Sequence, residues 1–278
     1  METHICGFGV GVRPDYIEQI PDHPRAPDFF EFFPHHFLGF GGGFRRAFEA
    51  VAERAPMVMH CTFLDPGGCS NLRADLLADL AALGRRIGSP YLSDHASWSG
   101  GRGAHFPELL PLPRTMEAVE HMAARTRQIS RGTGMKLALE NPSVYLRVPG
   151  DELDDAQFLS AVLEAADAPM LLDVNNIVVN ARNFGGDPCD VIDRLPLERV
   201  VQVHVAGHTW RGDIAIDTHV GPVPDSVWVA YQHLIRRAGR IIPTLIEWDT
   251  DIHSYDAVLD EADKARDLAL AALAREAA

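Results

Sequence analysis

Side chains that bind metals recur at one kind of place in this sequence, directly after short apolar runs. The runs end in the motifs VMHC, LSDH, LALEN, LLDVNN, VQVHVAGH and LIEWD, and a later segment reads IDTH. These motifs supply four imidazoles and four carboxylates: His60, His95, Glu140, Asp173, His204, Asp217, His219 and Glu247. Gathered in one small volume, the carboxylates would repel one another and lose their hydration. Bound cations offset both costs, because buried charges are paired or coordinate metals.

The number and type of these groups indicate what they would bind. Eight nitrogen and oxygen donors exceed what one ion needs, so the sequence predicts two or three metal ions with a bridging Glu or Asp. A donor set without Cys suits Fe, Mn or Zn, and the pattern does not choose among them. Asp217 and His219 form a local chelate, because alternate residues of an extended segment face the same side. The alternative interpretation treats each group as a hydrogen-bonding residue at a strand end, which explains their joint placement less well.

The elements that must position these groups are eight buried strands, apolar on both faces as in a parallel sheet. They are predicted at 5–12, 29–33, 57–61, 91–94, 136–139, 170–173, 200–204 and 244–248. Helices are predicted at 72–87 (capped by Asn71), 113–132, 154–166, 225–238 and 254–277, with weaker patterns after strands one, two and six. This alternation predicts a (β/α)8 TIM barrel formed by one domain over residues 1–278, with the donors at its mouth. An open doubly wound sheet is the competing fold, but its glycine fingerprint is missing from the sequence.

Composition restricts the class of protein. The chain has 278 residues, 46% of them hydrophobic, and a formal charge of −14. This composition argues against disorder, and the charge argues against binding to nucleic acid or an anionic membrane. The four cysteines do not suggest a disulfide framework in a chain of this size. The start lacks a signal-peptide pattern and no apolar run reaches the roughly 18 residues of a membrane span, so we expect a soluble cytoplasmic protein.

A few other residues allow two interpretations. His35 and His36 follow Pro34 and are expected in a surface loop, although they could line the mouth. Cys61 is expected to be a packed core thiol, since it points away from the face that His60 uses. The segment SWSGGRGAHF is either a mobile lid or an ordinary loop. Three asparagines after strand six could bind metal, substrate or backbone: Asn175, Asn176 and Asn180.

Several motifs in combination resemble a known family. The chain contains, in order, GVGVR, SDHASW, LENPSVY, LLDVNNIVVNA, HVAGH, IDTH and IEWD. Together they resemble the DUF692 family of multinuclear non-haem iron-dependent oxidases, over about residues 7–261. The resemblance implies a xylose-isomerase-like TIM barrel with two or three iron ions (Fe2+/Fe3+) at its mouth and O2 as co-substrate. It also implies a Cys-containing, ribosomally made precursor peptide as substrate, and a separate leader-peptide-binding protein as partner.

Carried over motif by motif, the resemblance implies roles for named residues. The eight donors above look like the iron ligands, with Asn176 as a further ligand. His208 looks like a group that contacts substrate or orients a ligand, and Asp94 and Asp249 are candidates to orient imidazoles. The residues expected to act in catalysis are His60, Glu140, Asp173 and His208. One departure stands out: relatives often carry an acid and Asn after the second strand, where this chain reads Phe32-Phe33-Pro34-His35-His36, with Glu31 earlier. This departure concerns substrate contacts and the reaction outcome, and not the ligands.

Three rival functions fit parts of the pattern. A divalent-metal sugar isomerase or epimerase of the xylose-isomerase-like type also gathers His and carboxylates at strand ends, but would work without oxygen. A metal-dependent phosphodiesterase resembling endonuclease IV would need basic DNA contacts, which the net charge disfavours. A non-catalytic barrel would have little use for eight ligand-type residues. The peptide oxidase is therefore the principal hypothesis.

Overall fold

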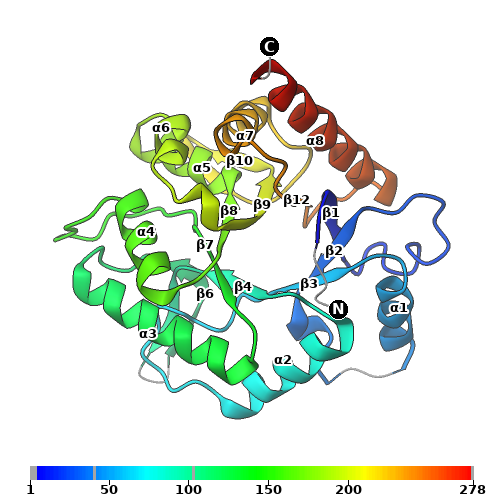
Figure 1. Ribbon diagram of the computed structural model, residues 1–278, viewed down its shortest axis with the longest axis horizontal. Helices are drawn as coiled ribbons and strands as arrows, with labels where there is room; N and C mark the ends of the chain where they lie inside the picture. The colour runs from blue at the N-terminus through cyan, green and yellow to red at the C-terminus, as the bar shows by residue number, and fades with distance from the viewer. Residues whose placement is uncertain (1–4, 40–41, 102–103, 277–278) are drawn as a thin grey trace.

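A closed barrel of eight parallel strands forms the centre of the computed structural model, which describes residues 5–39, 42–101 and 104–276. The strands follow the order β1-β12-β9-β8-β7-β4-β3-β2 around the barrel (Figure 1). They are β1 (Phe8–Gly11), β2 (Phe29–Phe32), β3 (Met57–His60), β4 (Leu92–His95), β7 (Leu137–Glu140), β8 (Met170–Asp173), β9 (Val200–Ala206) and β12 (Thr244–Glu247). Each matches one of the eight strands predicted from sequence, so the predicted TIM barrel is confirmed.

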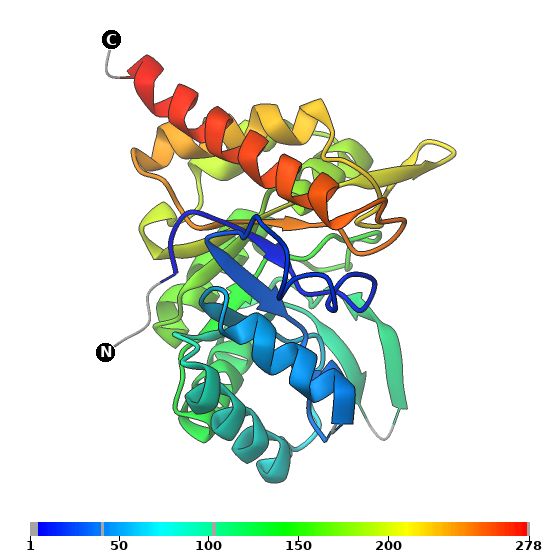
Figure 2. The ribbon, with the colours of Figure 1, turned by 90° about the vertical axis from the view of Figure 1, so that its right-hand side faces the viewer.

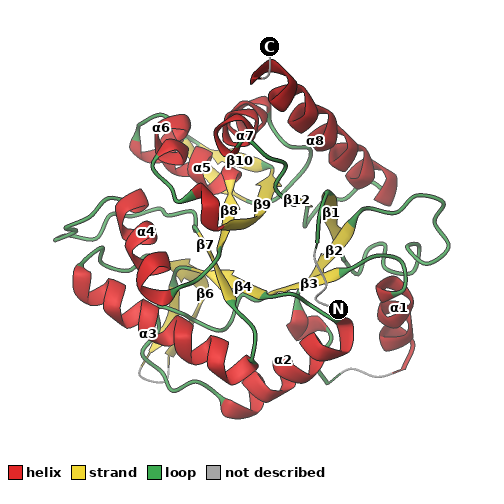
Figure 3. Cartoon of the chain, in the orientation of Figure 1, coloured by secondary structure: helices red, strands yellow, loops and turns green. Residues whose placement is uncertain are grey.

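Helices surround this barrel (Figure 3). They are α1 (Gly42–Ala52), α2 (Ala74–Ile87), α3 (Met116–Thr133), α4 (Asp155–Ala166), α5 (Val174–Phe184), α6 (Pro188–Asp193), α7 (Asp225–Ala238) and α8 (Tyr255–Glu276), with 3-10 turns η1 (Pro34–His36) and η2 (Leu197–Arg199). The prediction that Asn71 caps α2 was wrong, because the helix begins after Arg73, whose side chain makes no capping bond. The helix predicted from residue 113 begins at Met116, where Thr115 accepts a hydrogen bond from the Ala118 amide. Asp154 caps α4 through a capping box with Gln157.

Two antiparallel hairpins extend from the side of the barrel opposite the N-terminus (Figure 2). The first pairs β5 (Trp98–Gly101) with β6 (Ala104–Leu110), so SWSGGRGAHF belongs to a hairpin whose residues 102–103 lie outside the described residues. The second pairs β10 (His208–Arg211) with β11 (Ile214–Asp217). The second hairpin sets His208 directly opposite Asp217, and so returns the IDTH segment to the barrel mouth.

The barrel interior has an apolar layer beneath a polar one. The apolar layer contains Phe29, Val58, Tyr91, Ala138, Leu171 and Leu245. Two residues further along five of these strands stand Glu31, His60, Glu140, Asp173 and Glu247, all buried. Successive side chains of a strand alternate between its faces, so the donor two residues after an inward apolar residue also points inward, nearer the mouth. The larger core lies between the strands and the helices and fixes the strands around this polar layer.

Candidate metal centre

Three groups of donor atoms lie at the mouth of the barrel. The first cluster is His60, His95 and Glu140, the central cluster is Glu140, Asp173, His204 and Glu247, and the third cluster is His219, Glu247 and Asp249. Within each cluster, one donor atom from every residue lies within 4.8 Å of the others. The structure therefore brings together seven of the eight predicted donors, and Asp217 lies against His219.

Glu140 and Glu247 each belong to two clusters. In both residues, one carboxylate oxygen faces one cluster and the second oxygen faces the other cluster. Glu140 Oε2 lies 3.3 Å from Nε2 of both His60 and His95, whereas its Oε1 lies 3.4 Å from His204 Nδ1. Glu247 Oε2 lies 2.9 Å from His204 Nδ1, whereas its Oε1 lies 3.5 Å from His219 Nδ1. Each carboxylate is thus in position to bridge two neighbouring ions.

The polar atoms of these clusters fit metal ions. Among the described residues, two buried oxygens have no hydrogen-bond partner, Asp173 Oδ2 and Asn176 Oδ1. Four further buried atoms face an oppositely charged neighbour without the geometry of a hydrogen bond: Glu140 Oε2, His204 Nδ1, His219 Nε2 and Glu247 Oε2. Leaving a buried polar atom unsatisfied costs about 1–3 kcal/mol, so such a concentration needs a compensating ligand. Two donors on one ion with bonds of about 2.0–2.2 Å lie about 3.0–3.5 Å apart, close to the separations observed here.

The first cluster has its imidazoles oriented by neighbours. Ser93 Oγ donates to the Met59 carbonyl, so it accepts from His60 Nδ1 at 2.9 Å and leaves His60 Nε2 facing Glu140. The carboxylate of Asp94 lies 3.5 Å from His95 Nδ1 and also accepts from the backbone amides of His95 and Leu64. Asp94 is therefore placed to orient His95, as the sequence suggested.

The central cluster rests on a buried network that sequence reasoning did not assign. Glu31 Oε2 lies 3.0 Å from His204 Nε2 and accepts from Gln202 Nε2 at 2.6 Å. The hydroxyl of Tyr91 donates in turn to Gln202 Oε1. This arrangement holds the hydrogen of His204 on Nε2 and leaves Nδ1 free to bind a metal, since a partner on one ring nitrogen sets the role of the other. A lone acid in the apolar run FFEFF was the available signal, because a buried carboxylate needs a partner.

Asp173 and Asn176 lie side by side at the start of α5. Asp173, a member of the central cluster, caps this helix by accepting from the Asn176 amide through Oδ1, and its buried Oδ2 has no hydrogen-bond partner. The Asn176 side chain donates to the Asn141 carbonyl through Nδ2, and its Oδ1 is buried without a partner. Asn176 therefore offers a buried oxygen without a partner beside Asp173, and its role as a further ligand stays a prediction.

The third cluster lies beside a buried arginine. Asp249 Oδ2 lies 3.2 Å from His219 Nδ1, while Oδ1 accepts from the guanidinium of Arg13. On the other side, Asp217 Oδ1 lies 2.8 Å from His219 Nε2. Asp217 also accepts from Ser143 and Asn175. Asp249, expected only to orient an imidazole, thus also offers a donor atom to the third cluster.

His208 stands at the rim and connects to Asp217 through Asn175. Asn175 donates to Asp217 through Nδ2, so its Oδ1 accepts the hydrogen of His208 Nδ1 at 2.7 Å. Burial lowers the pKa of His208, and the nearby Asp217 only partly opposes this. His208 is therefore neutral near pH 7, with an unprotonated Nε2.

In the metal-free protein, protons bound by the cluster residues offset part of the negative charge of the carboxylates. Burial lowers the pKa of His95, but attraction to Glu140 and Asp94 outweighs it and raises this pKa to about 9. The pKa values of His204 and His219 are also raised, because their carboxylate neighbours outweigh burial. Burial and repulsion from Glu140 raise the pKa of Asp173 well above its usual range. Each of these protons must leave before the group can bind a metal.

His35 and His36 lie in η1 with rings 4.1 Å apart, and Phe33 connects them to His60 through a ring contact of 5.7 Å. His35 is exposed, as expected of a surface loop, and the contact of Phe33 with His60 places this turn beside the barrel mouth. Cys61 is a free, fully buried thiol, and burial raises its pKa, as expected of a core residue.

In the described part of the chain, no helix combines the length and apolar character that crossing a membrane requires.

Known sequences match nearly the whole chain. The family model of the RiPP precursor modification enzyme MbnB/TglH/ChrH matches residues 7–270. A UPF0276 protein of Acaryochloris marina is 38% identical over 263 residues, which cover 95% of each chain. A UPF0276 protein of Anaeromyxobacter sp. is 38% identical over 273 residues, covering 97% of this chain and 95% of the relative.

Solved structures show the same barrel. A D-tagatose 3-epimerase-like protein superposes with a TM-score of 0.62 at 15% identity, covering 98% of this chain and 100% of the other. A xylose isomerase domain protein from Alicyclobacillus acidocaldarius gives 0.57 at 17% identity, with coverages of 98% and 99%. Endonuclease IV from Thermus thermophilus gives 0.57 at 19%, with coverages of 94% and 97%. At such identities the likeness establishes the xylose-isomerase-like TIM barrel fold and nothing about activity.

Proposed function

Because the chain belongs to the family of RiPP precursor modification enzymes MbnB/TglH/ChrH, we propose that it is a multinuclear iron oxidase. Its substrate in this proposal is a cysteine residue of a ribosomally synthesised precursor peptide, and its oxidant is O2. The observation that carries the proposal is the row of three donor clusters joined by Glu140 and Glu247. A single-metal enzyme has no use for two carboxylates that each present one oxygen to either side.

The donor types support iron. The first cluster offers two imidazoles and one carboxylate, the composition of non-haem iron(II) sites that activate oxygen. The central cluster offers three carboxylates and one imidazole, hard donors that stabilise ferric iron. When bound, the ions would supply Lewis acidity toward a thiolate and the electrons that reduce oxygen.

The residues of the chain divide the remaining work. The eight cluster residues, Asn176 and Asp217 would hold the ions. Glu31 and Ser93 fix which ring nitrogen of His204 and His60 faces the metals. His208 Nε2 would accept a proton from the substrate at the rim, while Asn175 and Asp217 hold its ring in place.

The partners belong to the same proposal. We expect a Cys-containing precursor peptide and a separate protein that binds its leader segment. The net charge of −14 gives no support to nucleic acid as a substrate. A neighbouring gene for a short Cys-containing peptide would support the substrate, and failure of that peptide to be oxidised by the protein with or without a leader-binding protein would refute it.

The decisive experiment measures metal content and oxygen use. Protein purified anaerobically should hold two or three iron ions per chain, in line with three clusters, and should consume O2 with a Cys-containing peptide. Replacement of the exposed Glu164 by Gln on α4 serves as the control, since this residue is remote from the donor clusters. Fewer than two bound ions per chain would refute the multinuclear oxidase. Anaerobic epimerisation of a sugar with Mn2+ would support the sugar epimerase in its place.

A further inference from the structure

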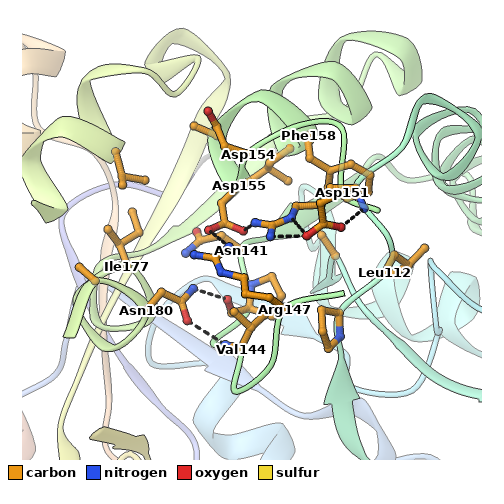
Figure 4. Close-up of a pocket in the computed structure, with 18 of the residues that line it drawn as sticks. Leu112, Asn141, Val144, Arg147, Asp151, Asp154, Asp155, Phe158, Ile177 and Asn180 are labelled. Carbon is orange, nitrogen blue, oxygen red and sulfur yellow. Dashed lines mark hydrogen bonds and ion pairs between the residues drawn. The ribbon is translucent and has the colours of Figure 1, made fainter. Parts of the chain in front are cut away.

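A cavity of about 190 Å³ lies beside the metal centre, between α4, α5, α6 and the segment that follows β7 (Figure 4). Its walls are mainly apolar and include Leu112, Val144, Phe158, Leu159, Ile177 and Leu195. An apolar cavity of about 150 Å³ is enough to hold a benzene molecule. The cavity therefore has room for one aromatic or branched aliphatic side chain.

The charges at this cavity are already neutralised by one another. Arg114 forms ion pairs with Asp151 and Asp155, and Arg147 also pairs with Asp155. Figure 4 labels Arg147 and both carboxylates. Arg194 pairs with Asp154. Every arginine among the residues lining the cavity thus has a carboxylate partner. A phosphate or carboxylate ligand would have to break one of these pairs, whereas a neutral apolar group would not.

The cavity and the metal centre share a wall, the segment of residues 142–146. Pro142, Val144 and Leu146 line the cavity. The residues between them face the other way: Ser143 donates to Asp217, and the Tyr145 hydroxyl accepts from the Asp217 amide at 2.9 Å. Alternate side chains of one segment therefore line the cavity on one side and hold Asp217 on the other.

Two asparagines secure this wall. Asn180 accepts from the Val144 amide and donates to the Pro142 carbonyl. Asn141, the residue after Glu140, exchanges hydrogen bonds of 2.8 and 2.9 Å with the backbone of Asp173. Both asparagines line the cavity, so its wall is attached directly to residues of the central cluster and to α5.

We propose that this cavity is a subsite for an aromatic or branched aliphatic side chain of the peptide substrate, next to the cysteine that enters the metal centre. The inference rests on the proposed peptide-oxidase function. The cavity would select peptides by an apolar residue near the reacting cysteine and would hold that cysteine in register with the clusters. Leu146, which is 49% exposed, marks the opening through which the side chain enters.

The test uses iron-loaded protein and three small probes: N-acetyl-phenylalaninamide, N-acetyl-leucinamide and N-acetyl-alaninamide. Calorimetry should show binding of the first two and much weaker binding of the third. Ala181→Phe places a ring in the cavity from α5 and should lower the affinity for the phenylalanine probe by about tenfold or more. Ala165→Phe, at an exposed position of α4 outside the cavity, should bind like the parent protein.

A second variant covers the case in which Ala181→Phe does not fold. Leu146→Glu changes an exposed residue and should lower the affinity for the two apolar probes. The control Val229→Glu changes a residue of α7 that is 59% exposed, and it should leave both affinities unchanged. Crystals soaked with N-acetyl-4-bromophenylalaninamide should show the bromine between Val144 and Ile177. Equal binding of the alanine probe, unchanged affinity in both cavity variants, or bromine elsewhere would overturn the subsite. Iron content and oxygen consumption are measured in parallel, so a failure of the oxidase function is recognised separately.

Discussion

Glu31 Oε2 lies 3.0 Å from Nε2 of His204, beneath the metal-facing side of the same imidazole. The contact joins β2 to β9 across the barrel, and both side chains are almost completely buried. Because Gln202 donates to the same oxygen, this carboxylate is held in place from two directions. Glu31 therefore acts on the central cluster through His204 rather than by contact with substrate.

Replacement of Glu31 by Gln should lower metal affinity. The substitution keeps the shape of the side chain but removes the charge that holds the hydrogen on His204 Nε2. Loss of such a partner behind a ligating His lowers metal affinity by about 10–100-fold. Competition with a fluorescent chelator measures the change, with Glu164→Gln as the control. An unaltered affinity would show that His204 does not depend on Glu31.

The two shared carboxylates should give different losses of metal. Glu247→Gln removes the negative charge and one of the two oxygens that the central and third clusters share, so the first cluster should keep its ion. Glu140→Gln alters the first and central clusters, so the third cluster should be the one retained. Iron analysis with Mössbauer spectroscopy distinguishes the two outcomes. Identical loss of all iron in both variants would mean that the clusters bind as one unit.

Metal binding should release protons near neutral pH. The pKa of His95 is raised to about 9, and those of His204, His219 and Asp173 are raised as well. The three imidazoles therefore carry an extra proton in the metal-free protein at pH 7 and must lose it on binding. Affinity should rise with pH up to about 9, the pKa of His95. Anaerobic calorimetry in buffers of different ionisation enthalpy counts the protons, and a binding enthalpy independent of buffer would contradict this account.

Arg13 should stabilise the metal-free fold through Asp249. Its guanidinium is buried, donates twice to Asp249 and lies over the Phe33 ring. Removing one member of a buried ion pair costs about 3–5 kcal/mol, and the partial exposure of Asp249 favours the lower end. Urea unfolding of the Arg13→Met variant should show this loss, and the double variant Arg13→Met with Asp249→Asn should recover part of it. Full loss in both would assign the effect to packing of Arg13 on Phe33.

The donor residues that the sequence predicted follow from the alternation of side chains along each strand. A ligand such as Glu140 or Asp173 stands two residues after a buried apolar residue of its own strand, and alternation along a strand is independent of the rest of the fold. The barrel follows from eight such strands, so the meeting of donors at one mouth was predictable. The metal-ligand roles themselves stay predictions until metal analysis tests them.

Other features depend on how the strands are staggered. Glu31 stands in register with Val58, two residues before His60 on the neighbouring strand, and this stagger brings its carboxylate against Nε2 of His204. Asn71 resembles a helix cap in sequence, but α2 starts later and its first turn has no side-chain cap. Such outcomes depend on contacts with strands and loops remote along the chain.

The sequence by itself determined the eight strands, the inward faces of their ends and hence the set of donors, because these follow from residue type and a period of two. Only the tertiary structure decided which oxygen of Glu140 and Glu247 faces which cluster, that Asp249 joins His219, and that residues 142–146 divide a cavity from Asp217. The physical reason is that strand register and loop placement are set by packing and hydrogen bonds between distant segments, which local pattern does not encode.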